Sequence, residues 1–173
     1  MAGVSREALN WQLLDIIRSM EEEGLVDHRL AKVHSMKENS GPFFFATTLS
    51  TFCHDSTETL RDLTQALGQI AINYQELEEF CIKMRGSASC IGGCRMANAC
   101  REHWRAFQNR SSRERCVTAL NTTKQEFLLL QEKMNSLVEL RNNLFKKWVN
   151  KLLLQQVETW AAEYWRQHKD KLQ

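Results

Sequence analysis

The chain has 173 residues and a formal net charge of +2, so its charge is close to balanced. This balance gives no reason to expect nucleic acid or a membrane surface as a partner, and no stretch is long and apolar enough to cross a bilayer. The N-terminus also lacks the basic-then-apolar pattern of a secretory signal. A single proline, seven glycines and few β-branched runs favour one all-α domain, large enough to bury a core.

The cysteines lack both CxxC pairs and the paired spacing of zinc ligands. They are Cys53, Cys81, Cys90, Cys94, Cys100 and Cys116. Cys81 falls on an apolar helix stripe, where a free cysteine behaves as a small hydrophobe. We therefore expect reduced, structural thiols in a cytoplasmic and nuclear protein, with no metal and no cofactor. A redox or metal role is the alternative.

Two helices are predicted before residue 42. The first spans residues 5–23 and stops at Gly24, with Trp11 expected to cap one end of its buried stripe. Asp27 suits the N-cap of a shorter second helix, which runs through Ala31 to Met36. The buried stripe of the first helix consists of Leu9, Leu13, Ile16, Ile17 and Met20.

A long third helix follows, with Pro42 in its first turn. Its apolar stripe is Phe45, Leu49, Phe52, Ser56, Leu60, Leu63, Leu67 and Ile70. His54 lies off this stripe, which indicates a solvated residue and not a ligand or phosphoryl acceptor. The pattern breaks at about Asn73, where the fourth helix begins, and that helix ends at Gly92-Gly93.

The fifth and sixth helices complete the predicted bundle. The fifth carries Met96, Cys100, His103 and Phe107 on its inner side, and there His103 reads as a hydrogen-bonded core residue. A turn at 108–110 precedes Ser111-Ser112-Arg113-Glu114, which matches a capping box that opens the sixth helix. The residues lining the sixth helix are Val117, Leu120, Phe127, Leu130, Met134, Leu137 and Leu144.

The fourth helix has an unusual outer surface. Its core stripe is Leu77, Cys81, Met84, Ala88 and Ile91. Outside that stripe, Ile82 is an apolar residue flanked by cations, and Gly86 costs about 1 kcal/mol relative to alanine in mid-helix. A glycine in that position signals close approach of another backbone or a partner. We interpret this side of the helix as a docking surface.

The same stretch carries a resemblance. The run R-G-S-A-S-C-I-G-G-C-R-M-A-N-A-C, from Arg85 to Cys100, resembles the signature of plant histidine-containing phosphotransfer proteins, H-Q-L-K-G-S-S-S-S-I-G-A-x-R-V-x-N-A-C. The similarity spans about residues 24–144. It includes Gly41-Pro42, Phe52, Asp55-Ser56 and Lys124-Gln125-Glu126. The phosphorylated histidine of the family lies four residues before the glycine, where this chain has Ile82. The sequence therefore resembles a pseudo form that lacks the phosphorylatable histidine.

The resemblance implies an up-and-down four-helix bundle over 42–144, with the helices of 1–41 packed on it and an extension at 145–173. It also implies a non-enzymatic protein of a two-component phosphorelay. Such a monomer would bind the receiver domains of hybrid histidine kinases and response regulators without accepting phosphate, and so damp cytokinin signalling. The expected docking face consists of Ile82, Lys83, Arg85, Gly86, Ser87 and Ser89.

From about Phe145 onward the resemblance stops. Trp148, Leu152, Trp160 and Tyr164 recur at near-helical spacing, with basic residues beside them. We favour an extension of the last helix that packs on the body, because such aromatics rarely stay exposed without a partner. The alternative is a helical adaptor that acts through this basic, aromatic segment. A third hypothesis, an active phosphocarrier that uses His54 or His103, ranks last.

Overall fold

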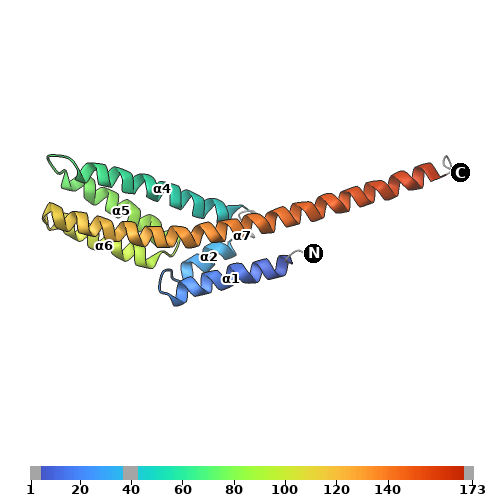
Figure 1. The fold of residues 1–173 in the computed structure, drawn as a ribbon, viewed down its shortest axis with the longest axis horizontal. Coiled ribbons are helices and arrows are strands. Elements are labelled where there is room, and N and C mark those ends of the chain that lie inside the picture. Colours follow the sequence, from blue (N-terminus) through green and yellow to red (C-terminus); the bar gives the residue numbers. More distant parts are fainter. Residues whose placement is uncertain (1–4, 37–42, 170–173) are drawn as a thin grey trace.

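A computed structural model describes residues 5–36 and 43–169 of the chain. Within these ranges the structure has six helices and no strand (Figure 1). They are α1 (Arg6–Glu22), α2 (His28–Ser35), α4 (Phe44–Leu67), α5 (Tyr74–Cys90), α6 (Cys94–Gln108) and α7 (Arg113–His168). The all-α fold predicted from the sequence is confirmed.

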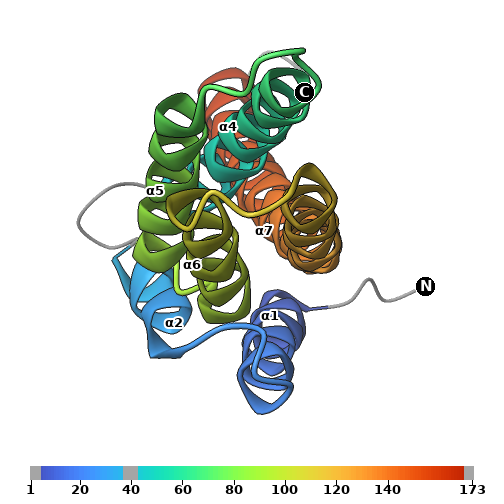
Figure 2. The same cartoon turned by 90° about the vertical axis from the view of Figure 1, so that its left-hand side faces the viewer.

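Helices α4, α5, α6 and the first half of α7 form an up-and-down four-helix bundle, in which each helix packs against two neighbours. Figure 2 looks along this bundle and shows the four helices around a common core, with α1 outside α7 and α2 below α5 and α6. The α2 segment is joined to the α5–α6 turn by two hydrogen bonds. The Asp27 N–H donates to the Gly92 carbonyl at 2.8 Å, and Arg29 Nη1 donates to the Ser89 carbonyl at 3.0 Å.

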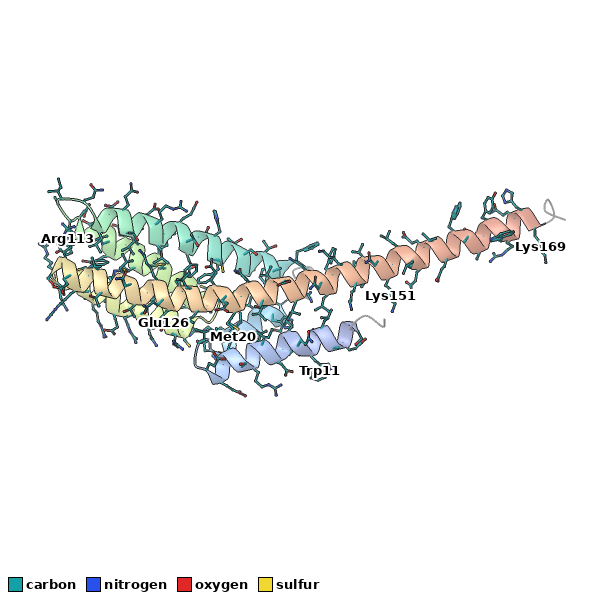
Figure 3. The ribbon with its side chains drawn as sticks, in the orientation of Figure 1. Trp11, Met20, Arg113, Glu126, Lys151 and Lys169 are labelled. Atoms are coloured by element: carbon teal, nitrogen blue, oxygen red, sulfur yellow. The ribbon has the colours of Figure 1, made fainter. Side chains whose placement is uncertain are left out.

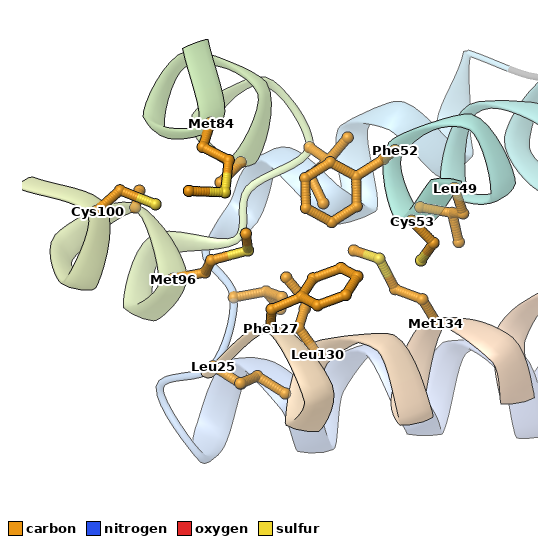
Figure 4. Close-up of a cluster of buried hydrophobic side chains, with 14 of the residues drawn as sticks. Leu25, Leu49, Phe52, Cys53, Met84, Met96, Cys100, Phe127, Leu130 and Met134 are labelled. Atoms are coloured by element: carbon orange, nitrogen blue, oxygen red, sulfur yellow. The ribbon is translucent and has the colours of Figure 1, made fainter. Parts of the chain in front are cut away.

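The core contains the apolar stripes predicted for these helices. At its centre, Phe52 of α4 meets Phe127 of α7 edge-on, with ring centroids 6.3 Å apart. Met84 of α5 and Met96 of α6 lie beside them (Figure 4), and flexible thioethers fill the irregular space between helices well. The bundle is thus held by one continuous hydrophobic cluster, to which α1 and α2 also contribute.

Side chains cap four of the helices. The predicted cap Asp27 is confirmed, because its side chain accepts a hydrogen bond from the Arg29 N–H. Asn73, where the sequence predicts a break, caps α5 in the same way by accepting from the Glu76 N–H. The capping box opening α7 is displaced by one residue from the prediction. Ser112, and not Ser111, is the N-cap, and its Oγ accepts from the Arg115 N–H at 3.4 Å. The Ser111 carbonyl instead accepts from the Tyr74 hydroxyl at 3.3 Å.

Three predicted core positions are wrong, and Pro42 lies outside the described residues. Ile70 is fully exposed because α4 ends at Leu67, before that residue. Val117 is exposed, whereas Cys116 is fully buried. Cys116, and not Val117, continues the four-and-three spacing of the buried residues Leu120 and Thr123. Trp11 is 66% exposed and does not cap the stripe of α1.

The most visible departure from expectation is the second half of α7. This helix is 56 residues long, and no glycine or proline interrupts it. The segment after Leu144 continues the helix as predicted, but it runs straight out past the end of the bundle (Figures 1 and 3). The expectation that it packs on the body is therefore wrong. Among the described residues, none of the helices has both the length and the apolar character needed to span a membrane.

Candidate functional site

At the centre of its outer side, α5 makes no contact with another helix. The inner stripe of this helix is buried against α4 and α6, as the sequence predicts. Turned by about half a helical rotation from that stripe, Ile82 is 47% exposed, and Lys83 and Gly86 are exposed beside it. An exposed isoleucine on an otherwise polar helix face is therefore a feature of the folded chain.

Gly86 is not required by the packing of this chain. A Cβ built on Gly86 would meet no atom within 4 Å. By contrast, a Cβ on Gly92 would lie 2.7 Å from the Leu30 backbone nitrogen, and one on Gly93 would lie 2.9 Å from Leu130 Cδ2. Gly92 and Gly93 thus serve the close approach of α2 and α7 to the α5–α6 turn. The close approach expected at Gly86 does not occur within the described chain, so that glycine leaves space open to solvent.

The six residues of the expected docking face do not all point the same way. Ile82, Lys83 and Gly86 form its exposed centre. Arg85 lies on the α6 side, where its guanidinium sits 5.9 Å from the centroid of the Trp104 ring. Ser89 is half-buried, and its carbonyl is used by Arg29 of α2. Ser87 lies on the opposite flank, toward α4.

The α4 flank of the docking face holds a hollow that sequence reasoning missed. Its volume is about 610 Å³, and Ser87 and the exposed thiol of Cys90 lie on its α5 side. Ile91, the C-cap residue of α5, also lines it. The lining residues of α4 and its N-cap are Phe43, Phe44, Thr47, Thr48, Thr51, Phe52 and Asp55. No local pattern in the sequence indicates this hollow, because its lining comes from two different helices.

The charge around Ile82 is more balanced than the expected docking face implies. The helix has two cations, Lys83 and Arg85, and three carboxylates, Glu76, Glu78 and Glu79. Glu79 is exposed and lies one turn before Ile82. The docking face is therefore mixed in sign, with Lys83 as its exposed cation.

An ion pair between Arg95 of the resembling run and Glu126 of the later matching stretch serves the fold. Arg95 of α6 and Glu126 of α7 pair at 2.9 Å between Nε and Oε2. They join two bundle helices and lie away from the exposed centre at Ile82. These two residues therefore have a structural role between α6 and α7.

None of the five histidines lies on α5. His103 is fully buried, with Nδ1 3.5 Å from Thr123 Oγ1, and burial lowers its pKa to about 4. It is the core histidine that the sequence predicts. His54 is solvated, as predicted, and lies 3.4 Å from Glu58. A phosphoryl acceptor needs an accessible nitrogen lone pair, and Ile82 has none.

The buried thiols are kept in their protonated form. Burial raises the pKa of Cys53 to about 11 and that of Cys100 to about 12, and it also raises the pKa values of Cys81 and Cys116. A thiol reacts and binds metal as its thiolate, so these groups are chemically inert packing residues. The described part of the chain contains no group of three or more side chains suited to hold a metal ion.

The bundle and the resembling run together define a helical bundle of the histidine-phosphotransfer type, and comparison with known proteins agrees. No family model matches the sequence. The chain is 28% identical to histidine-containing phosphotransfer protein 1 of Arabidopsis thaliana over 132 residues, which are 76% of this chain and 85% of that protein. It is 25% identical to pseudo histidine-containing phosphotransfer protein 2 of Oryza sativa subsp. japonica, over 76% of this chain and 87% of that protein.

Solved structures show the same fold. A crystal structure of a histidine-containing phosphotransfer protein from maize superposes with a TM-score of 0.73 at 25% identity, covering 79% of this chain and 99% of that one. A rice protein superposes with a TM-score of 0.75 at 23% identity, covering 80% of this chain and 97% of the rice chain. The chain is a homologue of the plant histidine-containing phosphotransfer proteins and their pseudo forms.

Proposed function

We propose that the chain is a pseudo histidine-containing phosphotransfer protein of a two-component phosphorelay, which docks receiver domains without accepting a phosphoryl group. The observation that supports this most is the exposed position of Ile82 at the centre of the outer side of α5. There it replaces the histidine of the family signature, while Gly86, Ser87 and Ser89 still match that signature. The surface for docking is retained and the nucleophile is absent.

The chemistry of this position follows from its side chain. In a phosphotransfer protein the imidazole nitrogen attacks the phosphorus of a receiver's aspartyl phosphate. The branched alkyl side chain of Ile82 has no lone pair, but it fills a similar space without a polar group to desolvate. A receiver bound here would keep its phosphoryl group. The protein would act by occupying the receiver and not by turning over a substrate.

The partners we propose are the receiver domains of hybrid histidine kinases and response regulators. Occupation of these domains by a chain that cannot relay phosphate would damp cytokinin signalling. The same partners would place the protein in the cytoplasm and the nucleus. The charge around the docking face is mixed, because Glu79 lies beside Lys83. Recognition of a receiver would therefore depend on shape and on the exposed Ile82 as much as on net charge.

A phosphotransfer assay combined with a binding titration tests the proposal. A receiver domain is titrated with the native chain, and a phosphorylated receiver is then incubated with it. We expect saturable binding, no label on the chain and a receiver that keeps its phosphoryl group. Label on the native chain would overturn the pseudo assignment, and absence of binding to a panel of receivers would overturn the docking role.

A second candidate function is a helical adaptor that acts through residues 145–173. The observation that favours it is the projection of this segment from the bundle with its aromatic side chains exposed (Figure 3). Removal of the residues after Leu144 separates the two functions. Receiver binding should survive the removal if α5 is the docking site, whereas an adaptor would lose its main partner.

A further inference from the structure

The hollow beside the docking face lies between α4 and α5, two helices that pack side by side in the bundle (Figure 2). We call it the flank hollow, and its volume is about 610 Å³. Ser87 belongs both to its lining and to the docking face, so the two surfaces are continuous. A partner that covers the centre of the docking face at Ile82 and Gly86 would therefore reach the flank hollow as well.

The charge of the flank hollow is negative. Among the described residues that line it, Asp55 is the only charged one. The Asp55 side chain is exposed and forms no ion pair within the described chain. Lys83 does not line the hollow, and Glu58, one turn after Asp55, lies 3.4 Å from His54. The hollow thus offers a single unpaired carboxylate.

The other lining groups also favour a cation. The Thr48 hydroxyl donates to the Phe44 carbonyl at 2.7 Å, so its lone pairs are left to accept hydrogen bonds. The Phe43 ring packs against Phe145, with centroids 4.3 Å apart, and remains 50% exposed. Aromatic rings attract cations over their faces. An apolar side chain would take water from Asp55 without replacing its hydrogen bonds, and an anion would be repelled.

We propose that the flank hollow is a subsite of the docking face that takes a lysine or arginine side chain of the receiver domain. This inference rests on the proposed docking of receivers through α5. The alkyl stem of the basic side chain would lie along the rings of Phe43 and Phe44, and its charged head group would pair with Asp55. The subsite would distinguish receivers by where they carry a cation, because a chain that turns over no phosphoryl group selects its partners by affinity alone.

Removal of the carboxylate tests the subsite in the full-length chain. A receiver domain that binds the native chain is titrated against Asp55→Asn, which keeps the shape of the side chain and removes its charge. We expect binding to weaken by about fivefold. Asp62→Asn is the matched control, because Asp62 is exposed on α4 and does not line the flank hollow. It should bind the receiver as the native chain does.

A second variant fills the hollow from within the chain. Residue 51 lies one turn before Asp55, so the guanidinium of Thr51→Arg can pair with that carboxylate and occupy the site. We expect it to weaken receiver binding by about tenfold or more. Thr57→Arg makes the same change on the α7 side of α4, outside the flank hollow, and should bind as the native chain does. Circular dichroism confirms the fold of each variant.

A double-mutant cycle identifies the side chain that the receiver contributes. Each exposed lysine and arginine of the receiver is changed to alanine and titrated against the native chain and against Asp55→Asn. We expect one receiver variant to lose about fivefold in affinity for the native chain and to lose nothing further against Asp55→Asn, because the two residues form one contact.

Each other outcome contradicts the subsite. Native-like binding by Asp55→Asn or Thr51→Arg, or a cycle in which no basic residue of the receiver couples to Asp55, would overturn it. An equal loss in Asp62→Asn would assign the effect to the general charge of α4 and not to the hollow. Loss of binding in a Gly86→Glu variant beside any of these results would leave the proposed function standing. A native chain that binds no receiver would overturn the subsite and the proposed function together.

Discussion

The guanidinium of Arg85 on α5 lies over the indole ring of Trp104 on α6, 5.9 Å from the ring centroid. This cation–π contact crosses between two bundle helices and is worth about 0.5–1 kcal/mol at a partly exposed site. This contact keeps the positive charge of Arg85 at the α6 edge of the outer face of α5. Lys83, which is exposed on the other side of Ile82, is left as the cation available for the first encounter with a partner.

Lys83→Ala should slow receiver association by about threefold at low salt and reduce the salt dependence of that rate, because rim charges act on association more than on dissociation. Arg85→Ala should change the association rate less, since Arg85 is already engaged with Trp104. Stopped-flow association at several ionic strengths gives both rates. Equal effects of the two substitutions would show that the contact with Trp104 does not restrain Arg85 in solution.

The helices of the bundle could be read from the sequence because each has a clear apolar stripe. The buried residues Leu77, Cys81, Met84 and Ala88 were all placed correctly by their spacing alone. The errors fall where the stripe meets a helix end. Ile70 fits the period of α4 but lies after its last turn, and in the first turn of α7 the buried residue is Cys116 and not Val117. Periodicity predicts which side of a helix is buried, and caps decide where the helix begins and ends.

The site was only partly predictable for a different reason. The exposure of Ile82 followed from its position outside the stripe of α5. The contact of Arg85 with Trp104 and the hollow beside Ser87 each join two helices, and no local pattern specifies such a juxtaposition. The projection of the extension was missed for the same reason. Its apolar period predicts burial, whereas the structure leaves Trp160, Tyr164 and Trp165 exposed.

Ile82→His should give the chain the ability to accept a phosphoryl group from a phosphorylated receiver. The new imidazole would stand on the exposed side of α5, with Gly86 leaving open space one turn later. The substitution should change the free energy of unfolding by no more than about 0.5 kcal/mol, because the position is on the surface. Transfer of label from a phosphorylated receiver measures the gain. Ile82→Gln, which adds polarity without an imidazole, is the control and should stay unlabelled.

A folded Ile82→His variant that binds the phosphorylated receiver and yet takes no label would contradict this prediction. It would mean that the geometry around residue 82 no longer aligns an imidazole with the aspartyl phosphate. Binding without transfer would still be compatible with docking on α5.

Gly86→Glu should weaken receiver binding by about tenfold or more without unfolding the bundle. The glutamate adds bulk and negative charge to the centre of the docking face, and like charges across an interface can cost several kcal/mol. The fold should tolerate it, because a Cβ at Gly86 meets nothing within 4 Å and glycine is a poor helix former. Titration calorimetry measures the affinity, and circular dichroism confirms the fold.

Gln65→Glu is the matched control for this charge. Gln65 is exposed on α4, beside a hollow shared with Lys124 of α7, and thus lies away from α5. It should bind receivers as the native chain does. Native-like binding by Gly86→Glu would show that receivers dock elsewhere on the bundle.

Acid should destabilise the bundle through His103 before most carboxylates are protonated. Burial lowers the pKa of this imidazole from 6.5 to about 4, so the unfolded chain binds the proton more readily than the folded chain. The contribution of the neutral His103 to the free energy of unfolding is therefore complete above about pH 7. It is lost as the pH falls from 6.5 toward 4, by about 3 kcal/mol in all. His103→Leu removes the titrating group, and Thr123 Oγ1 keeps its bond to the Ala119 carbonyl at 3.0 Å.

Urea unfolding at pH 7.5, 6, 5 and 4.5 should show a smaller loss of stability in the variant than in the native chain. Parallel losses in the two proteins would assign the acid sensitivity to other groups.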